Sequence, residues 1–234
     1  MARILSAGED FPPTSEAMDY PNGLLAMGGE LSCARLLAAY RCGIFPWFQA
    51  PDPVLWWTPD PRSVLFPGEL HISRSLRRTL RRNAFELAVD TRFREVMLAC
   101  AAPRPCQSGT WIGRAMLEAY CALHQAGHAH SLEVYAGGEL VGGLYGVAIG
   151  GAFFGESMFS RASDASKVAL VALAQLMRDS GGQLIDCQVA SDHLHSLGAR
   201  NLPRLDFEHL LAHTVDMEAG AISWRVPARC GDLR

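Results

Sequence analysis

Apolar residues recur with regular helical or strand periods along most of the chain after residue 62. Apolar alternation and short apolar runs predict strands, and three- and four-residue spacing predicts helices. Glycine pairs between successive strand segments predict hairpins. The expected strands cover residues 85–89, 130–136, 139–149, 152–158 and 183–189, and the expected helices 93–100, 112–125, 164–180, 191–197 and 205–214. Three antiparallel strands, a crossover helix and a further parallel strand predict an α/β (α+β) fold.

The first 62 residues follow neither period clearly. Ser32 can cap a short helix that Gly43 ends. The next segment, residues 44–62, contains five prolines and three tryptophans. Prolines at this density prevent a long helix or a central strand. We therefore expect a small N-terminal domain over residues 1–62 and a larger domain over residues 63–234.

Composition narrows the class of protein. With 234 residues, 49% of them hydrophobic and 19% charged, the chain has enough apolar side chains for a core and is unlike disordered, collagenous or coiled-coil sequences. It contains no run of about 18 apolar residues, so we expect no membrane association through a span. Seven cysteines without a CxxC spacing indicate reduced thiols, and hence a cytoplasmic protein. Its paired histidines lack a third ligand, so we expect no metal site.

Arginine is concentrated in one part of a chain whose net charge is −3. Residues 60–104 contain nine arginines against five acids. Within them, a helix capped by Ser73 would bury Leu76 and Leu80 and expose a continuous basic face. That face consists of Arg74, Arg77, Arg78, Arg81 and Arg82. Such a face favours a phosphate backbone as partner; the alternative is a solvated face neutralised by nearby carboxylates.

Polar residues interrupt two strands that are otherwise apolar. With a period of two, Asp186 and Gln188 share one face of the last predicted strand. On the preceding strand, Glu156 shares a face with Phe154 and Met158. Because a crossover helix makes the two strands parallel, Glu156, Asp186 and Gln188 are expected to converge at the ligand-binding end of the sheet.

A structural explanation of these polar residues stays open beside the functional one. Asp186 or Glu156 could cap a helix or pair with Arg161 or Lys167 instead of contacting a ligand. Trp47 and Trp111 present a similar choice, because they follow irregular or polar segments near the basic helix. They are expected to be either core residues or platforms on which nucleotide bases stack.

The predicted element order is also that of GNAT acyltransferases. A member that uses coenzyme A needs a glycine-rich loop before the long apolar helix, whose amides bind the pyrophosphate. The corresponding sequence here is FSRASDASK, which has no glycine and places Asp164 near the helix start. A carboxylate there would repel a pyrophosphate, so acyl-CoA is disfavoured as the donor.

Several unusual strings occur together in the chain. They are PNGLLAMGGELS, YRCGIFPWF, WWTPDPRSVL, LHISRSLRR, GTWI, GESMFSR, LIDCQV and SDHLHSLGA. Between about residues 19 and 207 the chain closely resembles the leucyl/phenylalanyl-tRNA–protein transferase family. The resemblance implies a small N-terminal domain followed by a GNAT-like domain.

The resemblance also implies an activity and its partners. The family transfers Leu or Phe, and also Met, from aminoacyl-tRNA to the α-amine of proteins that begin with Arg or Lys, which marks them for N-degron degradation. It requires no cofactor and no metal. The expected partners are therefore leucyl- and phenylalanyl-tRNA and such proteins.

The same resemblance assigns roles to particular residues. Trp47 and Trp111 match aromatic residues that contact the terminal adenosine, and the arginine face would hold the acceptor-stem phosphates. The aminoacyl pocket maps onto Leu144, Phe153, Met158, Leu173 and Ile185. Positions 144 and 173 depart from the Met and Phe of the best-known member, which should alter the Leu/Phe preference and not the chemistry.

For the chemistry we expect three residues to act together. Asp186 fixes Gln188, Gln188 aligns the attacking amine, and Glu156 completes the polar cluster, while the substrate's 2′-hydroxyl relays the proton. Two other hypotheses from different classes stay open at this point. One is an acyl-CoA-dependent GNAT N-acyltransferase, and the other is a non-catalytic tRNA-binding module.

Overall fold

The computed structural model describes residues 2–49, 51–103, 112–217 and 222–233. The strands are β1 (Arg3–Leu5), β2 (Leu24–Gly28), β3 (Phe45–Pro46), β4 (Leu55–Trp57), β5 (Arg62–Leu65), β6 (Glu86–Val89), β7 (Ala129–Ala136), β8 (Glu139–Ile149), β9 (Ala152–Ser160), β10 (Leu184–Gln188) and β11 (Arg200–Leu202). The α-helices are α1 (Cys33–Arg41), α2 (Arg74–Arg82), α3 (Phe93–Ala101), α4 (Arg114–Gln125), α5 (Ala165–Asp179), α6 (Asp192–Ser196) and α7 (Arg204–Val215). Short 3₁₀ turns lie at Thr14–Glu16, Pro67–Glu69 and Cys230–Asp232.

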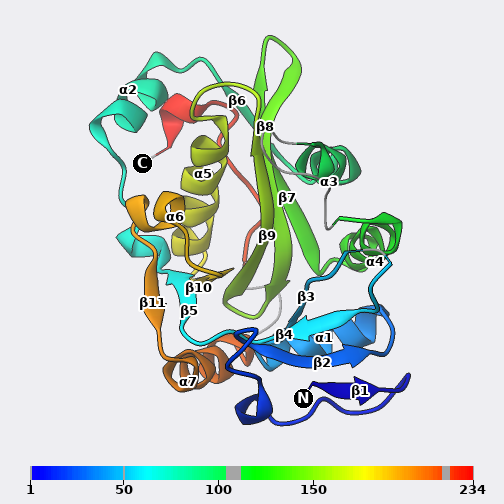
Figure 1. The fold of residues 1–234 in the computed structure, drawn as a ribbon. Helices are drawn as coiled ribbons and strands as arrows, with labels where there is room; N and C mark the ends of the chain where they lie inside the picture. The colour runs from blue at the N-terminus through cyan, green and yellow to red at the C-terminus, as the bar shows by residue number, and fades with distance from the viewer. Residues whose placement is uncertain (1, 50, 104–111, 218–221, 234) are drawn as a thin grey trace.

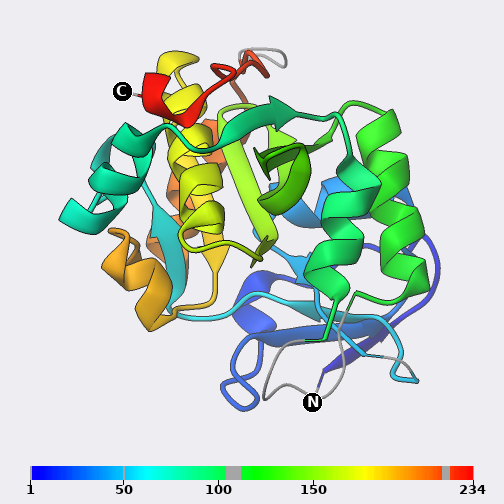
Figure 2. The same cartoon turned by 90° about the horizontal axis from the view of Figure 1, so that it is seen from above.

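Two sheets organise the chain. The smaller has the order β1-β2-β4-β3, and the larger has the order β11-β5-β10-β9-β8-β7-β6. In the larger sheet β9 and β10 are parallel, and the other neighbouring strands are antiparallel. Helix α5 covers one face of this sheet and α3 with α4 the other, while the smaller sheet lies at one end (Figures 1 and 2). The α/β fold with a small N-terminal part is thus confirmed.

The strands and helices predicted after residue 84 are present with small shifts at their ends. β7, β8 and β9 form the two expected hairpins, whose turns contain the two glycine pairs. Helix α5 then crosses over to β10, as the order of elements predicted. In the described ranges, no helix combines the length and the apolar character that crossing a membrane requires.

Two strands at the far side of β10 were missed. β5 and β11 are only four and three residues long, and they extend the sheet beyond its expected edge. β5 opens with Arg62 and Ser63, which are both buried although their side chains are polar. Because short strands with polar residues carry no clear alternation, the hydrophobic pattern did not reveal them.

The hydrophobic core has one part on each face of the larger sheet. One part joins residues of the smaller sheet, such as Leu25 and Trp56, to α3, α4 and α7. The other lies under α5 and includes Leu144, Phe153 and Leu173. The smaller sheet therefore packs into a core that it shares with the larger sheet. The domain boundary at residue 62 stays a prediction.

Candidate active site

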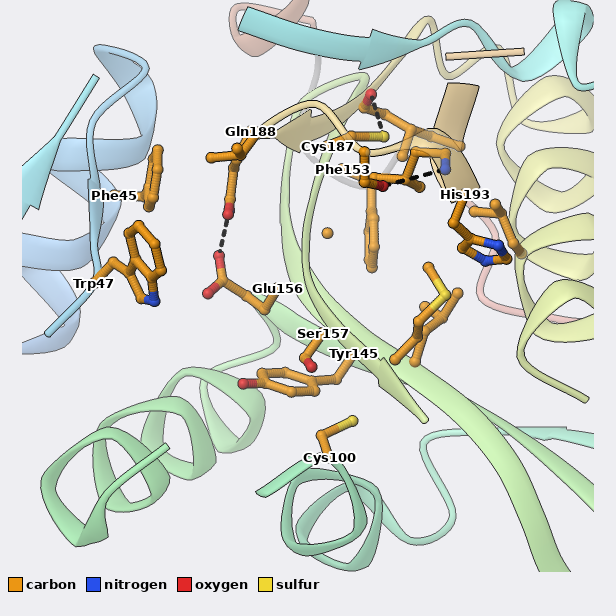
Figure 3. A pocket seen from close by; sticks show the side chains of 18 of the residues that line it. Phe45, Trp47, Cys100, Tyr145, Phe153, Glu156, Ser157, Cys187, Gln188 and His193 are labelled. Carbon is orange, nitrogen blue, oxygen red and sulfur yellow. Dashed lines mark hydrogen bonds between the residues drawn. The ribbon is translucent and has the colours of Figure 1, made fainter. Parts of the chain in front are cut away.

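A cavity of about 600 Å³ opens between the larger sheet, α5, α6 and β3. Its apolar side includes each of the five residues predicted for the aminoacyl pocket, together with Leu170 of α5. Leu170 was not predicted, because α5 is apolar almost all round and its period does not show which positions face a cavity. The other side is mixed in character and includes Phe45, Trp47, Glu156 and Gln188 (Figure 3).

An irregularity in β9 changes which side chains face the cavity. In the pairing of β8 with β9, Tyr145 lies opposite Ser157 and Gly146 opposite Gly155, so Glu156 is an extra residue in β9. Phe154 consequently packs on the α3 side of the sheet and Met158 on the α5 side. The prediction that Phe154, Glu156 and Met158 share one face is therefore wrong, because it assumed an uninterrupted period of two.

A second irregularity lies directly beside the first, in β10. The register of β10 against β5 shifts between Asp186 and Gln188, and Gln188 has a left-handed backbone with φ of 63°. Gln188 therefore lines the cavity, whereas Asp186 is fully buried behind it. The expectation that Asp186 shares a face with Gln188 and reaches the same cavity mouth is wrong for this reason.

Glu156 and Gln188 form the polar centre of the cavity. The Nε2 of Gln188 donates a hydrogen bond to Glu156 Oε1 over 2.9 Å (Figure 3). The same carboxylate accepts the hydroxyl of Tyr40 at 2.5 Å and that of Tyr120 at 3.1 Å. Burial raises the pKa of Glu156 to about 7, although these hydrogen bonds act in the opposite direction. A carboxyl group at the cavity thus changes charge near neutral pH.

Asp186 forms a buried ion pair with Arg62. Two guanidinium nitrogens of Arg62 donate to its two oxygens over 2.9 and 2.7 Å, and both side chains are fully buried. Asp186 Oδ1 also accepts the backbone N–H of Gln188 at 2.9 Å. Neither Arg161 nor Lys167, the partners considered from the sequence, pairs with Asp186. The geometry makes Asp186 a residue that positions the backbone of Gln188.

Arg62, Tyr40 and Tyr120 were not predicted as site residues. Buried tyrosines on apolar helix faces are ordinary core residues, so their sequence positions carried no functional signal. The signal for Arg62 was an arginine two positions before the apolar run Val64–Leu65. Its guanidinium lies between the rings of Phe45 and Phe207, 4.8 and 4.6 Å from their centroids.

Two further groups lining the cavity have restricted chemistry. Burial raises the pKa of the Cys187 thiol to about 12, so this cysteine is not poised as a nucleophile. The buried hydroxyl of Tyr145 has no hydrogen-bond partner among the described residues, and burial raises its pKa well above the ordinary value. Neither group supplies a base or a nucleophile at neutral pH.

The two tryptophans predicted to stack on adenosine differ in what the structure says of them. Trp47 follows β3, lines the cavity and is 46% exposed. The ring of Trp57 lies 5.7 Å from it, and the Trp57 indole N–H donates to the Trp47 carbonyl oxygen over 2.6 Å. Trp47 is thus a supported, accessible aromatic surface. Trp111 lies outside the described residues.

Helix α2 carries the predicted arginine face. Ser73 caps it by accepting the N–H of Leu76, and Leu76 and Leu80 are buried. All five arginines of the face are exposed. Within the described ranges, none of them forms an ion pair with a carboxylate. The carboxylates of the described residues therefore leave the charge of this face unpaired.

The start of α5 is occupied by side chains of the protein itself. Asp164 accepts hydrogen bonds from Thr79 of α2 at 2.9 Å and from Lys167 at 3.0 Å. These bonds lower the pKa of Asp164 below its usual value, although burial opposes them. A carboxylate therefore stands at the start of α5, where it would repel an anion.

The chain matches two family models that together span most of its length. Residues 64–212 match the leucyl/phenylalanyl-tRNA protein transferase model, and residues 29–60 match the N-terminal domain of the same family. Among solved structures, a GCN5-related N-acetyltransferase-like protein from Streptococcus suis covers 72% of this chain and 64% of its own, with 11% identity and a TM-score of 0.34. That likeness is too distant to define the fold, which rests on the strand order described above.

Curated relatives cover nearly the whole chain. A leucyl/phenylalanyl-tRNA–protein transferase of Nitrosomonas eutropha is 56% identical over 224 residues, which is 96% of each chain. That of Nitrosomonas europaea is 59% identical over 90% of this chain and 89% of its own. That of Pseudomonas putida is 57% identical over 92% and 95%. The chain therefore belongs to the leucyl/phenylalanyl-tRNA protein transferase family.

Proposed function

We propose that this protein is an aminoacyltransferase. It moves Leu or Phe, and also Met, from aminoacyl-tRNA to the N-terminal α-amine of proteins that begin with Arg or Lys, and so marks them for N-degron degradation. The observation that carries the proposal is an apolar pocket whose mouth holds the Glu156–Gln188 pair beside the exposed ring of Trp47. Because aminoacyl-tRNA is the donor, we expect the reaction to take place in the cytoplasm. The partners of the protein are leucyl- and phenylalanyl-tRNA and proteins that begin with Arg or Lys.

The pocket suits an unbranched or γ-branched apolar side chain. Leu144, Phe153 and Ile185 supply walls without polar atoms, and Phe153 is fully buried. We expect the entrance of the pocket to exclude side chains that branch at Cβ by steric contact, which discriminates more strongly than one missing methylene. Trp47 gives the terminal adenosine a surface on which to stack.

The transfer forms one bond and breaks another. The neutral α-amine of the acceptor attacks the ester carbonyl carbon, the C–N bond forms, and the bond from that carbon to the ribose oxygen breaks. The proton lost by the amine goes to the departing ribose oxygen, with the neighbouring ribose hydroxyl as relay. Because that amine has an ordinary pKa of about 7.7–8.0, positioning supplies most of the acceleration.

Gln188 and Glu156 hold the acceptor amine in this scheme. Since Gln188 Nε2 donates to Glu156, the amide oxygen of Gln188 is the atom left to accept from the amine. Glu156 also supplies negative charge for the cationic residue that begins the acceptor. Asp186 acts through Gln188, whose backbone it holds, and is a positioning residue.

The rate of transfer is expected to rise with pH through about 7 in addition to the titration of the acceptor amine. Glu156, whose pKa is raised to about 7, is protonated below that pH and ionised above it. The ionised form binds Gln188 and a cationic acceptor more strongly. Single-turnover rates between pH 5.5 and 8.5 measure this. In Glu156→Gln, the rate should depend on pH only through the titration of the acceptor amine. If the rate of this variant still rises with an apparent pKa near 7, Glu156 is not the group responsible.

Removing two charges from the α2 face is expected to weaken tRNA binding without changing its sequence preference. The double variant Arg77→Ala/Arg78→Ala should reduce the slope of log K against log salt by about 1.5–2, because fewer counterions are released. Filter binding between 50 and 300 mM salt measures it. Arg114→Ala, on the exposed side of α4, is the matched control and should leave the slope unchanged. An unaltered slope in the double variant would remove α2 from the tRNA site.

A transfer assay tests the proposed function as a whole. The protein is incubated with charged leucyl-tRNA and a peptide that begins with Arg, and the peptide's mass is measured. Addition of one leucine is expected. A non-catalytic tRNA-binding module would leave the mass unchanged, and an acyl-CoA-dependent enzyme would act only after coenzyme A thioester is added. The carboxylate of Asp164 at the start of α5 disfavours that last alternative.

A further inference from the structure

The C-terminal segment over residues 222–233 packs back onto the larger sheet, beyond the residues that the family model matches. The N–H of Leu87 in β6 donates to the Ala228 carbonyl over 2.9 Å, and the N–H of Cys230 donates to the Phe85 carbonyl over 3.0 Å. The N–H of Ser223 donates to the Ser180 hydroxyl at the end of α5 over 3.0 Å. These contacts hold the segment in place on both sides of Trp224.

Trp224 touches the pocket wall from behind. Its ring is stacked on that of His130 in β7, with centroids 3.6 Å apart and planes inclined by 9°. Trp224 also contacts Phe153; the centroids of these two rings are 5.9 Å apart and their planes are inclined by 48°. Phe153 lines the cavity, so Trp224 is one ring removed from the aminoacyl pocket.

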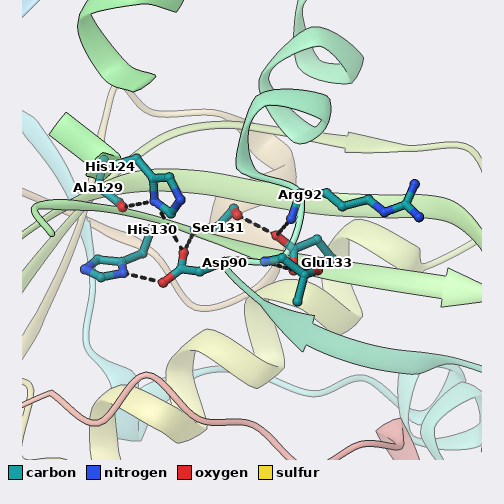
Figure 4. Close-up of polar contacts among 8 residues, drawn as sticks. Asp90, Arg92, His124, Ala129, His130, Ser131 and Glu133 are labelled. Carbon is teal, nitrogen blue, oxygen red and sulfur yellow. Dashed lines mark hydrogen bonds and ion pairs between the residues drawn. The ribbon is translucent and has the colours of Figure 1, made fainter. Parts of the chain in front are cut away.

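The far end of this stack is anchored. His130 Nδ1 is 2.7 Å from Asp90 Oδ2, and Asp90 Oδ1 accepts the backbone N–H of Ser131 at 2.8 Å (Figure 4). Asp90 has a left-handed backbone with φ of 58°, which turns its carboxylate back toward β7. The imidazole ring of His130 is therefore held in place, and the indole of Trp224 stacks on it.

A glycine leaves the space in which Phe153 lies. Gly146 is the partner of His130 in the pairing of β7 with β8, so it separates His130 from β9. A Cβ at position 146 would lie 2.6 Å from Cε1 and Cζ of Phe153. The Phe153 ring thus extends across a bare position of β8, and Trp224 supplies a side-chain contact that holds it there.

We propose that Trp224 is a specificity-determining positioning residue, which rests on the function proposed above. By packing on Phe153, it sets how far that ring reaches into the aminoacyl pocket and hence how large a side chain the pocket prefers. Without the indole, Phe153 can withdraw into the vacated space, and the pocket becomes deeper. A deeper pocket fits Phe better and contacts Leu less.

The test compares donors in a single assay. The ratio of kcat/KM for phenylalanyl-tRNA to that for leucyl-tRNA is measured with an Arg-starting peptide. Trp224→Ala is expected to raise the ratio about tenfold, the order of discrimination that apolar pockets achieve. Trp224→Phe, which keeps a ring, should restore it. Val226→Ala, in the same segment and packed against the same core, is the matched control and should leave the ratio unchanged.

A second comparison shows whether the effect passes through Phe153. In a Phe153→Leu background, Trp224→Ala should no longer change the ratio. An equal loss with both donors, or the same shift in that background, would overturn the proposal. If Trp224→Ala does not fold, Trp224→Leu keeps the apolar bulk without the flat ring and serves the same purpose.

The packing can be tested separately from the function. Failure of the wild-type protein to transfer either amino acid would refute the proposed function alone. A crystal structure of Trp224→Ala would still report on the wall, because the Phe153 ring should leave its wild-type rotamer. An unmoved ring would overturn the inference even if the wild-type protein is active.

Discussion

Gln188→Ala is expected to lower the single-turnover rate of transfer about 100- to 1,000-fold, the scale on which loss of precise positioning acts. The substitution removes the amide whose oxygen accepts from the incoming amine and whose Nε2 is bonded to Glu156. It leaves the apolar pocket and the α2 face intact, so the dissociation constant for aminoacyl-tRNA should change little. Rapid quench with prebound leucyl-tRNA and saturating Arg-starting peptide separates the two quantities.

Ser157→Ala is the matched control for Gln188→Ala. Ser157 also lines the cavity, but its hydroxyl makes no hydrogen bond to the Glu156–Gln188 pair. Its replacement should leave the rate within about twofold of wild type, because substitutions that break no such interaction usually change free energies by less than about 0.5 kcal/mol. A near-wild-type rate for Gln188→Ala would remove Gln188 from the chemistry.

Arg62→Ala is expected to lower the free energy of unfolding by about 3–5 kcal/mol, because it leaves a buried carboxylate without its partner. Asp186 then loses both guanidinium hydrogen bonds at a place from which water is excluded. Urea unfolding at pH 7 measures the change. The rate of transfer should fall as well, since the Asp186 carboxylate that holds the Gln188 backbone is no longer fixed.

Two comparisons separate the loss of a partner from the loss of a favourable pair. Arg62→Met/Asp186→Leu removes both charges and should recover much of the stability, but not the activity. Arg3→Ala breaks an exposed ion pair with Glu9 and should change stability little. If Arg62→Ala were as stable as wild type, the pair would not be the buried interaction described above.

Regular parts of the fold could be predicted because their patterns are long. Strands β7, β8 and β9 and helix α5 are largely apolar segments of 8, 11, 9 and 15 residues, and glycine pairs separate or end them. The convergence of Glu156 and Gln188 also followed from a general rule, that parallel strands joined by a crossover place their C-terminal ends together.

The side of the sheet to which each site residue points could not be predicted, because it depends on two irregular positions in the strands. Extra or shifted residues at Glu156 and Gln188 break an alternation that any periodic argument takes as continuous. Arg62 was missed for another reason: its partner lies 124 positions away, and nothing in the local sequence connects the two. The pocket residues came from family resemblance, since apolar side chains look alike whether they line a core or a cavity.

The position of Arg62 has a consequence for dissecting the protein. Its guanidinium is enclosed by Phe45 from the smaller sheet and Phe207 from α7, while its partner Asp186 belongs to β10. Segments from the beginning, the middle and the end of the chain must therefore assemble before Gln188 acquires its backbone anchor. Excising the first sixty residues should therefore disable the Glu156–Gln188 pair although both residues remain, because Phe45 would no longer cover Arg62 and Tyr40 would no longer bond Glu156.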